Sequence, residues 1–248
     1  MAARPGLLLL AAAVGALALA GPAAAQSLSI DLGGEGGSLT ARLAQLFILI
    51  TLLSLAPGLA IMVTCFPFMV TTLSILRQAI GVQQAPPNMM IVSLALFLTY
   101  FVMEPVAQQA WREGVQPLIE GTIAEEEGVA RAFEPFRVFM EGRVDPDTLA
   151  VMIEASPQRD ALAGGERPPA SVLIPSYLIS EIQRGFEVGF LIFLPFLVID
   201  LVIASVLMSM GMMMVPPAVV ALPFKLAFFV VADGWTLLAG ALVRGYAG

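Results

Sequence analysis

The stretch MSMGMMMVPP, residues 208–217, lies between two apolar segments in the last quarter of the sequence. These segments cover roughly residues 188–210 and 218–243. The paired prolines cannot continue the first segment as a helix, because proline lacks a backbone N–H and disfavours helical geometry in the residue before it. We therefore expect two apolar helices that fold back on each other as a hairpin. Pro195 and Pro223 lie inside these helices, and each is expected to introduce a kink.

Methionine is concentrated in the turn of this hairpin. Its long, unbranched and polarizable side chain fills irregular gaps and repacks at low cost. Copies of such a turn arranged in a ring would form an apolar constriction that blocks ions by dewetting but could move aside for a passing chain. Gly211 is expected to add backbone freedom. The alternative is an ordinary hairpin turn that dips into an interface. The methionines are Met208, Met210, Met212, Met213 and Met214.

The composition of the 248-residue chain indicates a membrane protein. Hydrophobic residues make up 58% of it and charged residues only 12%, whereas soluble domains average about 25% charged residues. Histidine is absent, which excludes histidine-containing catalytic triads and HExxH zinc sites. We expect no catalytic residues, no bound metal and no cofactor. The single cysteine, Cys65, cannot form a disulfide within the chain.

The first 40 residues have the composition of a targeting segment followed by a linker. Residues 1–25 contain Arg4, an apolar core and a final run of three alanines, which is the pattern of a cleavable secretory signal peptide. The alternative is an uncleaved first membrane helix. Residues 26–40 are rich in glycine and polar residues and are predicted to be flexible.

Residues 41–103 are predicted to form the N-terminal hydrophobic helices. The run 41–64 is long enough to cross about 30 Å of hydrocarbon, although Pro57-Gly58 is expected to interrupt it. The following block, 66–103, is divided by a polar turn, and its second part, from Met89 onward, is short for a membrane span.

That polar turn, GVQQAPPN at residues 81–88, contains a proline pair. Pro86 and Pro87 are expected to end one helix and to begin another, because the residue before a proline avoids the helical region. Arg77 lies upstream, and we expect it to cap or pair near this turn, whose last residue is Asn88. The simpler alternative is retention of a basic residue on the inner side of the membrane.

Residues 104–170 differ from the rest of the chain in charge, with 13 acidic and 6 basic residues. They are predicted to form an acidic helical subdomain, which a cleaved signal peptide would place in the periplasm. Asp145 followed by Pro146 is a typical helix start, and the helix is expected to end near Glu154. A flexible linker, residues 155–171, is expected next.

The hairpin of residues 171–248 completes an all-α architecture of four long, kinked, apolar helices with the acidic subdomain inserted between them. Asp200 and Lys225 are nearly equidistant from Met213 along the sequence, so each lies about 20 Å from the turn. They are therefore expected to pair across the hairpin and set its register. A proton-relay role and contact with a partner are the alternatives.

A second group of ionisable residues lies at helical spacing in SEIQRGFEVG, residues 180–189. Glu181, Arg184 and Glu187 occur at every third position, which predicts that the arginine lies between two carboxylates. Gly185 and Gly189 form a GxxxG pattern, which favours close helix packing.

Three long stretches closely resemble the FliP/SctR family of type III secretion export gates, in its flagellar branch. The resemblance implies that several copies assemble with FliR and FliQ into a helical ring in the bacterial inner membrane, within the flagellar basal body. The axis of the ring would be a channel for unfolded flagellar proteins, FlhB and FlhA would be further partners, and no nucleic acid would be bound. The stretches are LSILRQAIGVQQAPPNMMIVSLALFLTYFVMEPV (73–106), SYLISEIQRGFEVGFLIFLPFLVIDLVIASVLMSMGMMMVPP (176–217) and LPFKLAFFVVADGW (222–235).

The resemblance also assigns roles to individual positions. It implies that residues 208–214 form a gasket that seals the resting channel. It further implies that the assembled hairpins lie largely on the periplasmic side, so that apolar length does not require a membrane span. The chain departs from the family at residues 66–69, where an expected arginine is missing and Pro67 is expected to break the helix, and at Glu104, which replaces a small polar residue.

Other functions would use the same residues differently. Asp200, Lys225 and Asp233 lie in apolar surroundings, which is also compatible with a proton or ion transporter. An injectisome export-gate subunit is a closer alternative, although the signal peptide suits the flagellar branch better. An intramembrane protease is disfavoured, because the sequence has no GxSxG or GxGD motif and no histidine.

Overall fold

The computed structural model describes residues 39–82, 85–157, 159–162, 167–212 and 214–246, and these are entirely free of β-strands. The predicted all-helical fold is therefore confirmed for this part of the chain. The predicted signal peptide and most of the predicted flexible segment lie outside the described residues. The helices are α2 (Leu39–Met62), α3 (Phe66–Ile80), α4 (Asn88–Ala110), η1 (Trp111–Val115), α5 (Gln116–Ile119), α6 (Glu125–Glu141), α7 (Pro146–Glu154), α8 (Arg159–Leu162), α9 (Ala170–Ser209), α10 (Pro217–Val231) and α11 (Gly234–Arg244).

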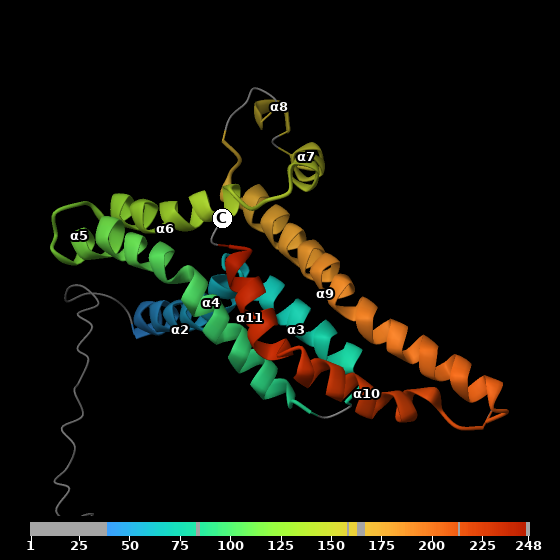
Figure 1. The fold of residues 1–248 in the computed structure, drawn as a ribbon. Helices are drawn as coiled ribbons and strands as arrows, with labels where there is room; N and C mark the ends of the chain where they lie inside the picture. Colours follow the sequence, from blue (N-terminus) through green and yellow to red (C-terminus); the bar gives the residue numbers. More distant parts are fainter. Residues whose placement is uncertain (1–38, 83–84, 158, 163–166, 213, 247–248) are drawn as a thin grey trace, which may run out of the picture. The chain divides into compact units, whose positions relative to one another are not determined.

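The chain divides into two units, residues 1–52 and 53–248. Of the first unit, the structure describes only the beginning of α2. That helix continues through Pro57-Gly58, so the interruption expected there does not occur. The second unit contains all the other described helices (Figure 1).

The centre of the second unit is the packing of α3 against α9. The backbones approach closely at two glycines of α9. A Cβ added at Gly189 would lie 2.4 Å from Ile75 Cδ1, and one added at Gly185 would lie 3.0 Å from Thr71 Cβ. A Cβ at Gly189 would force Ile75 to shift, and one at Gly185 would be in tight contact with Thr71, so the GxxxG pattern serves helix packing as predicted.

Pro67 begins α3 instead of breaking it, so the sequence-based expectation was wrong. The proline lies in the first turn of the helix, where a backbone N–H would have no partner within the helix. The N-cap residue, Cys65, accepts a hydrogen bond from the Met69 N–H through its carbonyl oxygen, at 3.2 Å. In the first turn, unlike the helix interior, proline removes no hydrogen bond of the helix.

The helix that follows the polar turn is longer than expected. α4 continues past Met103 to Ala110, and η1 and α5 extend the helical run to Ile119. Asn88–Ile119 is therefore long and apolar enough to cross a membrane, contrary to the prediction of a short segment. Glu104 lies within α4, where its carboxylate accepts a hydrogen bond from Gln108 Nε2 at 3.1 Å, so the predicted boundary at this position falls inside a helix.

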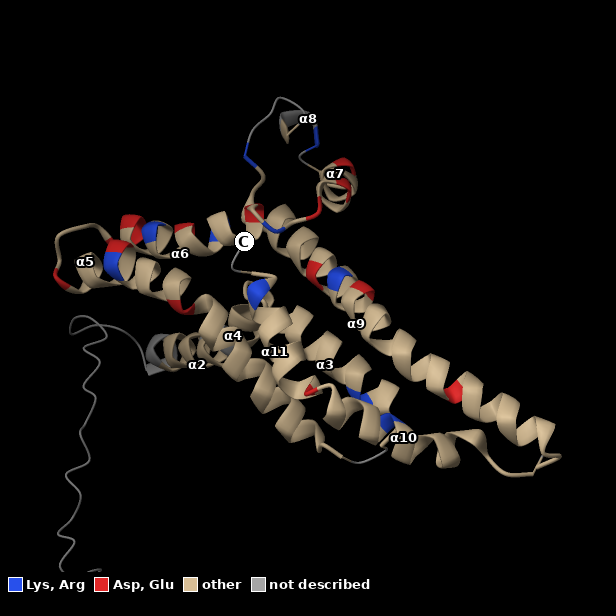
Figure 2. Ribbon diagram, in the orientation of Figure 1, with Lys and Arg blue, Asp and Glu red and all other residues tan. Residues whose placement is uncertain are grey.

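The region rich in charge is helical, and its predicted helix start is confirmed. Asp145 Oδ2 accepts a hydrogen bond from the Thr148 N–H at 2.8 Å, and α7 ends at Glu154. The expected linker 155–171 is interrupted by α8 and ends in the first turn of α9. Figure 2 shows that charged residues gather on η1, α6, α7 and the first half of α9.

The two apolar segments near the C-terminus form the predicted hairpin, but its second arm bends sharply. α9 is assigned as one 40-residue helix through Pro195, and α10 continues through Pro223. The bend of 62° falls between α10 and α11, where Asp233 has a left-handed φ of 50°. The last helix, α11, then packs against α4 (Figure 1).

Much of the apolar surface has no partner within the chain. α9 is long and apolar enough to cross a membrane, yet only 11% of its most apolar part is buried. Phe190, Leu191 and Leu201 of α9 are each about 60% exposed. An apolar surface of this size on a folded chain indicates contact with lipid or with other protein chains.

Candidate functional site

The methionine-rich turn lies at the end of the hairpin formed by α9 and α10 (Figure 1). Its side chains are not packed into the core: Met214 is 97% exposed and Met212 is 41% exposed, whereas Met69 and Met140 are fully buried. Met208 and Met210 are exposed to a similar extent, about 60% each. Met213 lies outside the described residues. We call residues 208–214 the methionine loop.

The backbone of this loop is held by a helix-terminating hydrogen-bond pattern. Gly211 has a left-handed φ of 77°, and its N–H donates to the Met208 carbonyl at 3.0 Å. The Met212 N–H donates to the Leu207 carbonyl at 3.0 Å. These two bonds form a Schellman motif, in which glycine is favoured because it adopts positive φ without strain. Gly211 therefore closes the end of α9, whereas the sequence suggested that it would add backbone freedom.

The prolines hold the other side of the loop. Pro216 is the N-cap of α10, and its carbonyl accepts a hydrogen bond from the Val219 N–H at 3.2 Å. Pro217 occupies the first turn of α10, where the missing N–H costs nothing. The methionine side chains are thus presented between two well-defined helix ends.

Asp200 and Lys225 form the predicted ion pair, with 2.6 Å between Lys225 Nζ and Asp200 Oδ2. Lys225 is only 5% exposed, and its ammonium group also donates a hydrogen bond to the Ala79 carbonyl at 3.0 Å. This carbonyl belongs to the last turn of α3, where carbonyls lack partners within the helix and attract positive charge. The lysine therefore joins three helices, α3, α9 and α10.

A buried acidic group lies at the other end of α9. Glu181 is fully buried, and its Oε1 lies 3.3 Å from Arg184 Nη1 and 3.8 Å from Arg143 Nε. The Tyr246 hydroxyl donates a hydrogen bond to Glu181 Oε2. The Arg143 guanidinium carbon lies 4.1 Å from the Tyr246 ring centroid. We call these four residues the Glu181 cluster; it ties α9 to the loop before α7 and to the turn after α11.

The predicted role of Glu187 is wrong. Among the described residues it makes no ion pair with Arg184, and its carboxylate accepts a hydrogen bond from Gln183 Nε2 at 3.0 Å. Arg184 instead donates to the Arg143 carbonyl at 3.3 Å. The arginine turns towards buried acceptors because charge interactions are stronger there than at the exposed surface.

The polar turn before α4 is closed by the residues that the sequence indicated. Arg77 Nη1 donates a hydrogen bond to Asn88 Oδ1, so the predicted pairing near the turn is confirmed. Pro87 is the N-cap of α4, and the peptide bond between Ala85 and Pro86 is cis.

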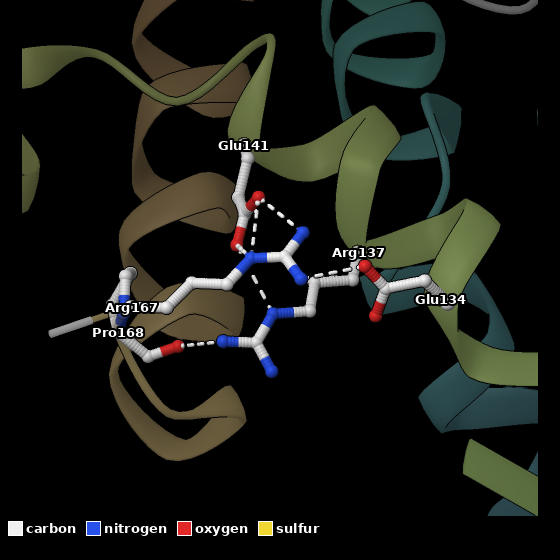
Figure 3. Close-up of polar contacts among 5 residues, drawn as sticks. All are labelled: Glu134, Arg137, Glu141, Arg167 and Pro168. Atoms are coloured by element: carbon white, nitrogen blue, oxygen red, sulfur yellow. Dashed lines mark hydrogen bonds and ion pairs between the residues drawn. The ribbon is translucent and has the colours of Figure 1, made fainter. Parts of the chain in front are cut away.

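A second charged cluster, which the sequence analysis missed, holds the segment before α9 (Figure 3). Arg167 Nη1 lies 2.6 Å from Glu134 Oε1, and Arg167 Nη2 lies 2.8 Å from Glu141 Oε2. Arg137 donates to Glu141 and to the Pro168 carbonyl. The hydrogen bonds from Arg167, and then from Arg137, hold the pKa of Glu141 below its usual value.

Helical spacing could have revealed the pair Arg137–Glu141, which are four residues apart, but no local pattern could have revealed the distant partners. Arg143 and Tyr246 lie far from Glu181 in the sequence, and Arg167 is separated from Glu141 by two further helices. Opposite charge alone does not select one partner among several residues of the same type, because surface ion pairs are weak and common.

These features define a class: an all-helical membrane protein whose central helical hairpin carries an exposed methionine loop and buried ionic contacts. We call these contacts, the Asp200–Lys225 pair and the Glu181 cluster, the ionic framework. The FliP family matches residues 49–242. Flagellar biosynthetic protein FliP of Caulobacter vibrioides is 48% identical over 244 residues, which cover 98% of this chain and 91% of the relative. The chain belongs to the FliP family, as the resemblance indicated.

Other relatives agree over similar lengths. Flagellar biosynthetic protein FliP of Agrobacterium fabrum is 46% identical over 233 residues, or 93% of this chain and 95% of the relative. The protein of the same name in Bacillus subtilis is 40% identical over 202 residues, or 82% of this chain and 91% of the relative. The family match, residues 49–242, covers the hairpin and the positions of the methionine loop.

Proposed function

We propose that this protein is a non-enzymatic channel subunit of the flagellar type III protein export gate. Its role would be to pass unfolded flagellar proteins across the bacterial inner membrane. The observation that carries the proposal is the exposed methionine loop at the end of a hairpin whose apolar faces are largely uncovered. Membership of the FliP family supports the flagellar assignment.

The loop would act as a gasket when several copies surround a common axis. A ring of thioether side chains excludes water and ions, because an apolar constriction of this kind dewets. Methionine also repacks at low cost, so the same ring can yield to a passing polypeptide. Because Gly211 and Pro216 hold the backbone on both sides, opening would proceed mainly through side-chain movement.

The ionic framework would fix the position of the methionine loop relative to α3 in each subunit. Lys225 joins α3 to both arms of the hairpin, and the Glu181 cluster fixes the other end of α9. Asp200 Oδ1 is buried and has no hydrogen-bond partner among the described residues. Since buried acceptors are nearly always satisfied, a donor from a neighbouring subunit would complete this site.

The uncovered apolar faces supply the surface for assembly. We propose a homo-oligomeric helical ring that also contains FliR and FliQ, with FlhB and FlhA as further partners. The ring would belong to the flagellar basal body, and the acidic residues of α6 and α7 would face the periplasm. This arrangement would bury the apolar residues of α9 against neighbouring subunits, in addition to lipid.

Proton or ion transport by this chain alone is the second candidate, because an ion pair lies within apolar helices. The contacts of Lys225 favour a structural role, since its ammonium group already has two acceptors, Asp200 Oδ2 and the Ala79 carbonyl. The variants Asp200→Asn and Lys225→Met should impair assembly of the complex. If both variants assemble and export like wild type, neither role applies to this pair.

Deletion of Met212 to Met214 tests the gasket directly. Membranes that contain the assembled complex should then leak ions in the resting state, as measured with a potential-sensitive dye. The control variant Met89→Leu/Met90→Leu removes two exposed methionines from α4 and should remain tight. A deletion variant that assembles, keeps normal motility and leaves the membrane as tight as before would contradict the proposed function.

A further inference from the structure

We infer that the methionine loop is an oxidation site, and that conversion of its thioethers to sulfoxides by peroxide or hypohalous acid opens the resting gate. The inference rests on the proposed gasket function but adds a modification and its chemical agent. It is drawn from the distribution of exposed and buried methionines in the fold.

The chain contains two groups of methionines that differ sharply in access. Met69 and Met140 are fully buried, and Met103 is 5% exposed. The described methionines of the loop, by contrast, are between 41% and 97% exposed, with Met214 the highest. Oxidation of methionine requires that the reagent reach the sulfur atom, so the loop should react before the buried methionines. Met89 and Met90 of α4 are also exposed, 81% and 61%, and should react as well, but they lie outside the proposed gasket.

The loop can accept oxygen without losing its backbone structure. The bonds that end α9 join main-chain atoms of Leu207, Met208, Gly211 and Met212, and they do not involve a sulfur atom. In the reaction, the sulfur lone pair attacks a peroxide oxygen, the O–O bond breaks, an S–O bond forms and water leaves after proton transfer. The sulfur is oxidised by two electrons, and the peroxide is reduced by two.

The product differs from methionine in the property on which a gasket depends. A sulfoxide is polar and accepts hydrogen bonds, whereas a thioether is apolar. A constriction that excludes ions by dewetting would become wettable when its lining turns polar. Sulfoxide formation therefore should increase ion leakage while the helices and their ion pairs stay in place. Methionine sulfoxide reductases should reverse the change by removing the oxygen as water with electrons from a thiol.

The first measurement maps the modification. Membranes that contain the full complex are treated with hydrogen peroxide, and sulfoxides are quantified by peptide mass spectrometry. Residues 208–214 should be oxidised at least about fivefold faster than Met69 and Met140, because burial excludes the reagent. Equal rates in the two groups, or protection of the loop, would overturn the inference.

The second measurement links the modification to leakage. Peroxide should raise the resting ion leak of the wild-type complex about tenfold, and the two methionine sulfoxide reductases that reduce the two sulfoxide epimers, supplied together with dithiothreitol, should restore the seal. A variant with leucine at all five methionines of the loop keeps an apolar lining and should stay tight in peroxide. The variant Met89→Leu/Met90→Leu should respond like wild type, because those residues lie at the start of α4.

The outcomes separate the inference from the proposed function. If deletion of Met212 to Met214 causes a leak but oxidation of the loop does not, the gasket stands and the oxidation switch is wrong. If the deletion causes no leak, the gasket itself fails. If the five-leucine variant still leaks in peroxide, the reactive site lies elsewhere, and the inference is also wrong.

Discussion

The two halves of α9 differ in what surrounds them, although they form one continuous helix. The first half is packed within the chain: Tyr177 and Glu181 are fully buried, and Gly185 and Gly189 contact α3. The second half has an apolar surface that is mostly exposed, with Leu201 62% exposed as an example. The first half is therefore stabilised by contacts within this chain. The exposed apolar surface of the second half must be covered by lipid or by other chains. Substitutions in the two halves should differ accordingly in their effects on stability and on leakage.

Arg143→Met should have the largest effect on stability, because it removes an ionic partner from the buried Glu181 and a cation–π contact from Tyr246. Loss of a partner from a buried pair costs about 3 kcal/mol of unfolding free energy. The measurement is thermal unfolding of the purified chain in detergent. The matched control, Arg131→Met, breaks an ion pair in which both side chains are 51% exposed and should cost less than about 1 kcal/mol. Similar losses in both variants would show that the Glu181 cluster is not a stabilising centre.

Gly189→Ala should weaken the contact between α3 and the first half of α9. The new Cβ would meet Ile75, and overpacking of this kind costs roughly 1–3 kcal/mol. Gly58→Ala provides the comparison, because a Cβ at that position in α2 meets no atom within 4 Å. Chemical denaturation should show a lower stability for Gly189→Ala alone. If the two alanine variants are equally stable, the close approach does not contribute to stability.

Gly211→Ala should disturb the backbone at the C-terminal end of α9 without affecting the packing of the first half of that helix. A residue other than glycine at a left-handed φ costs about 1 kcal/mol, so the methionine loop should shift and the resting leak should rise. Gly121→Ala is the matched control, since Gly121 has a similar φ of 67° but lies in the turn before α6. An equal leak in both variants, measured with the potential-sensitive dye, would argue against a positioning role for Gly211.

The smallest expected effect is the change in stability on acidification, which arises from the contact of Glu141 with Arg167 in the segment before α9. The pKa of Glu141 is lowered in the folded chain, so its contribution to stability is fully present above the ordinary value of 4.5 and is lost as pH falls through the lowered pKa. Arg167→Gln should therefore reduce stability at pH 7 but have little effect near pH 2. The check is the difference in melting temperature between wild type and variant across this range. A difference that does not change with pH would rule out the Glu141 contact as its source.

Several contacts could be predicted because their partners lie at short or symmetric distances along the sequence. The pairing of Asp200 with Lys225 follows from their nearly equal separation from the turn, and the capping by Asp145 follows from the local pattern of a helix start. The length of α4 could not be predicted, since Glu104 suggested a boundary that the helix passes through. The place of Pro67 in the first turn of α3 was also missed, because a proline that ends a helix and one that begins a helix look alike without their surroundings.

The sequence by itself determined the membrane class, the helical hairpin and the position of the methionine loop, because hydrophobic length, proline pairs and residue spacing act locally along the chain. Only the tertiary structure decided which partners surround Glu181, that Lys225 also caps α3, and that Glu187 stays outside the ionic framework. These contacts depend on tertiary packing, because a buried charge pairs with whichever distant groups the fold brings near it. The spacing of residues along the sequence does not indicate which groups these are.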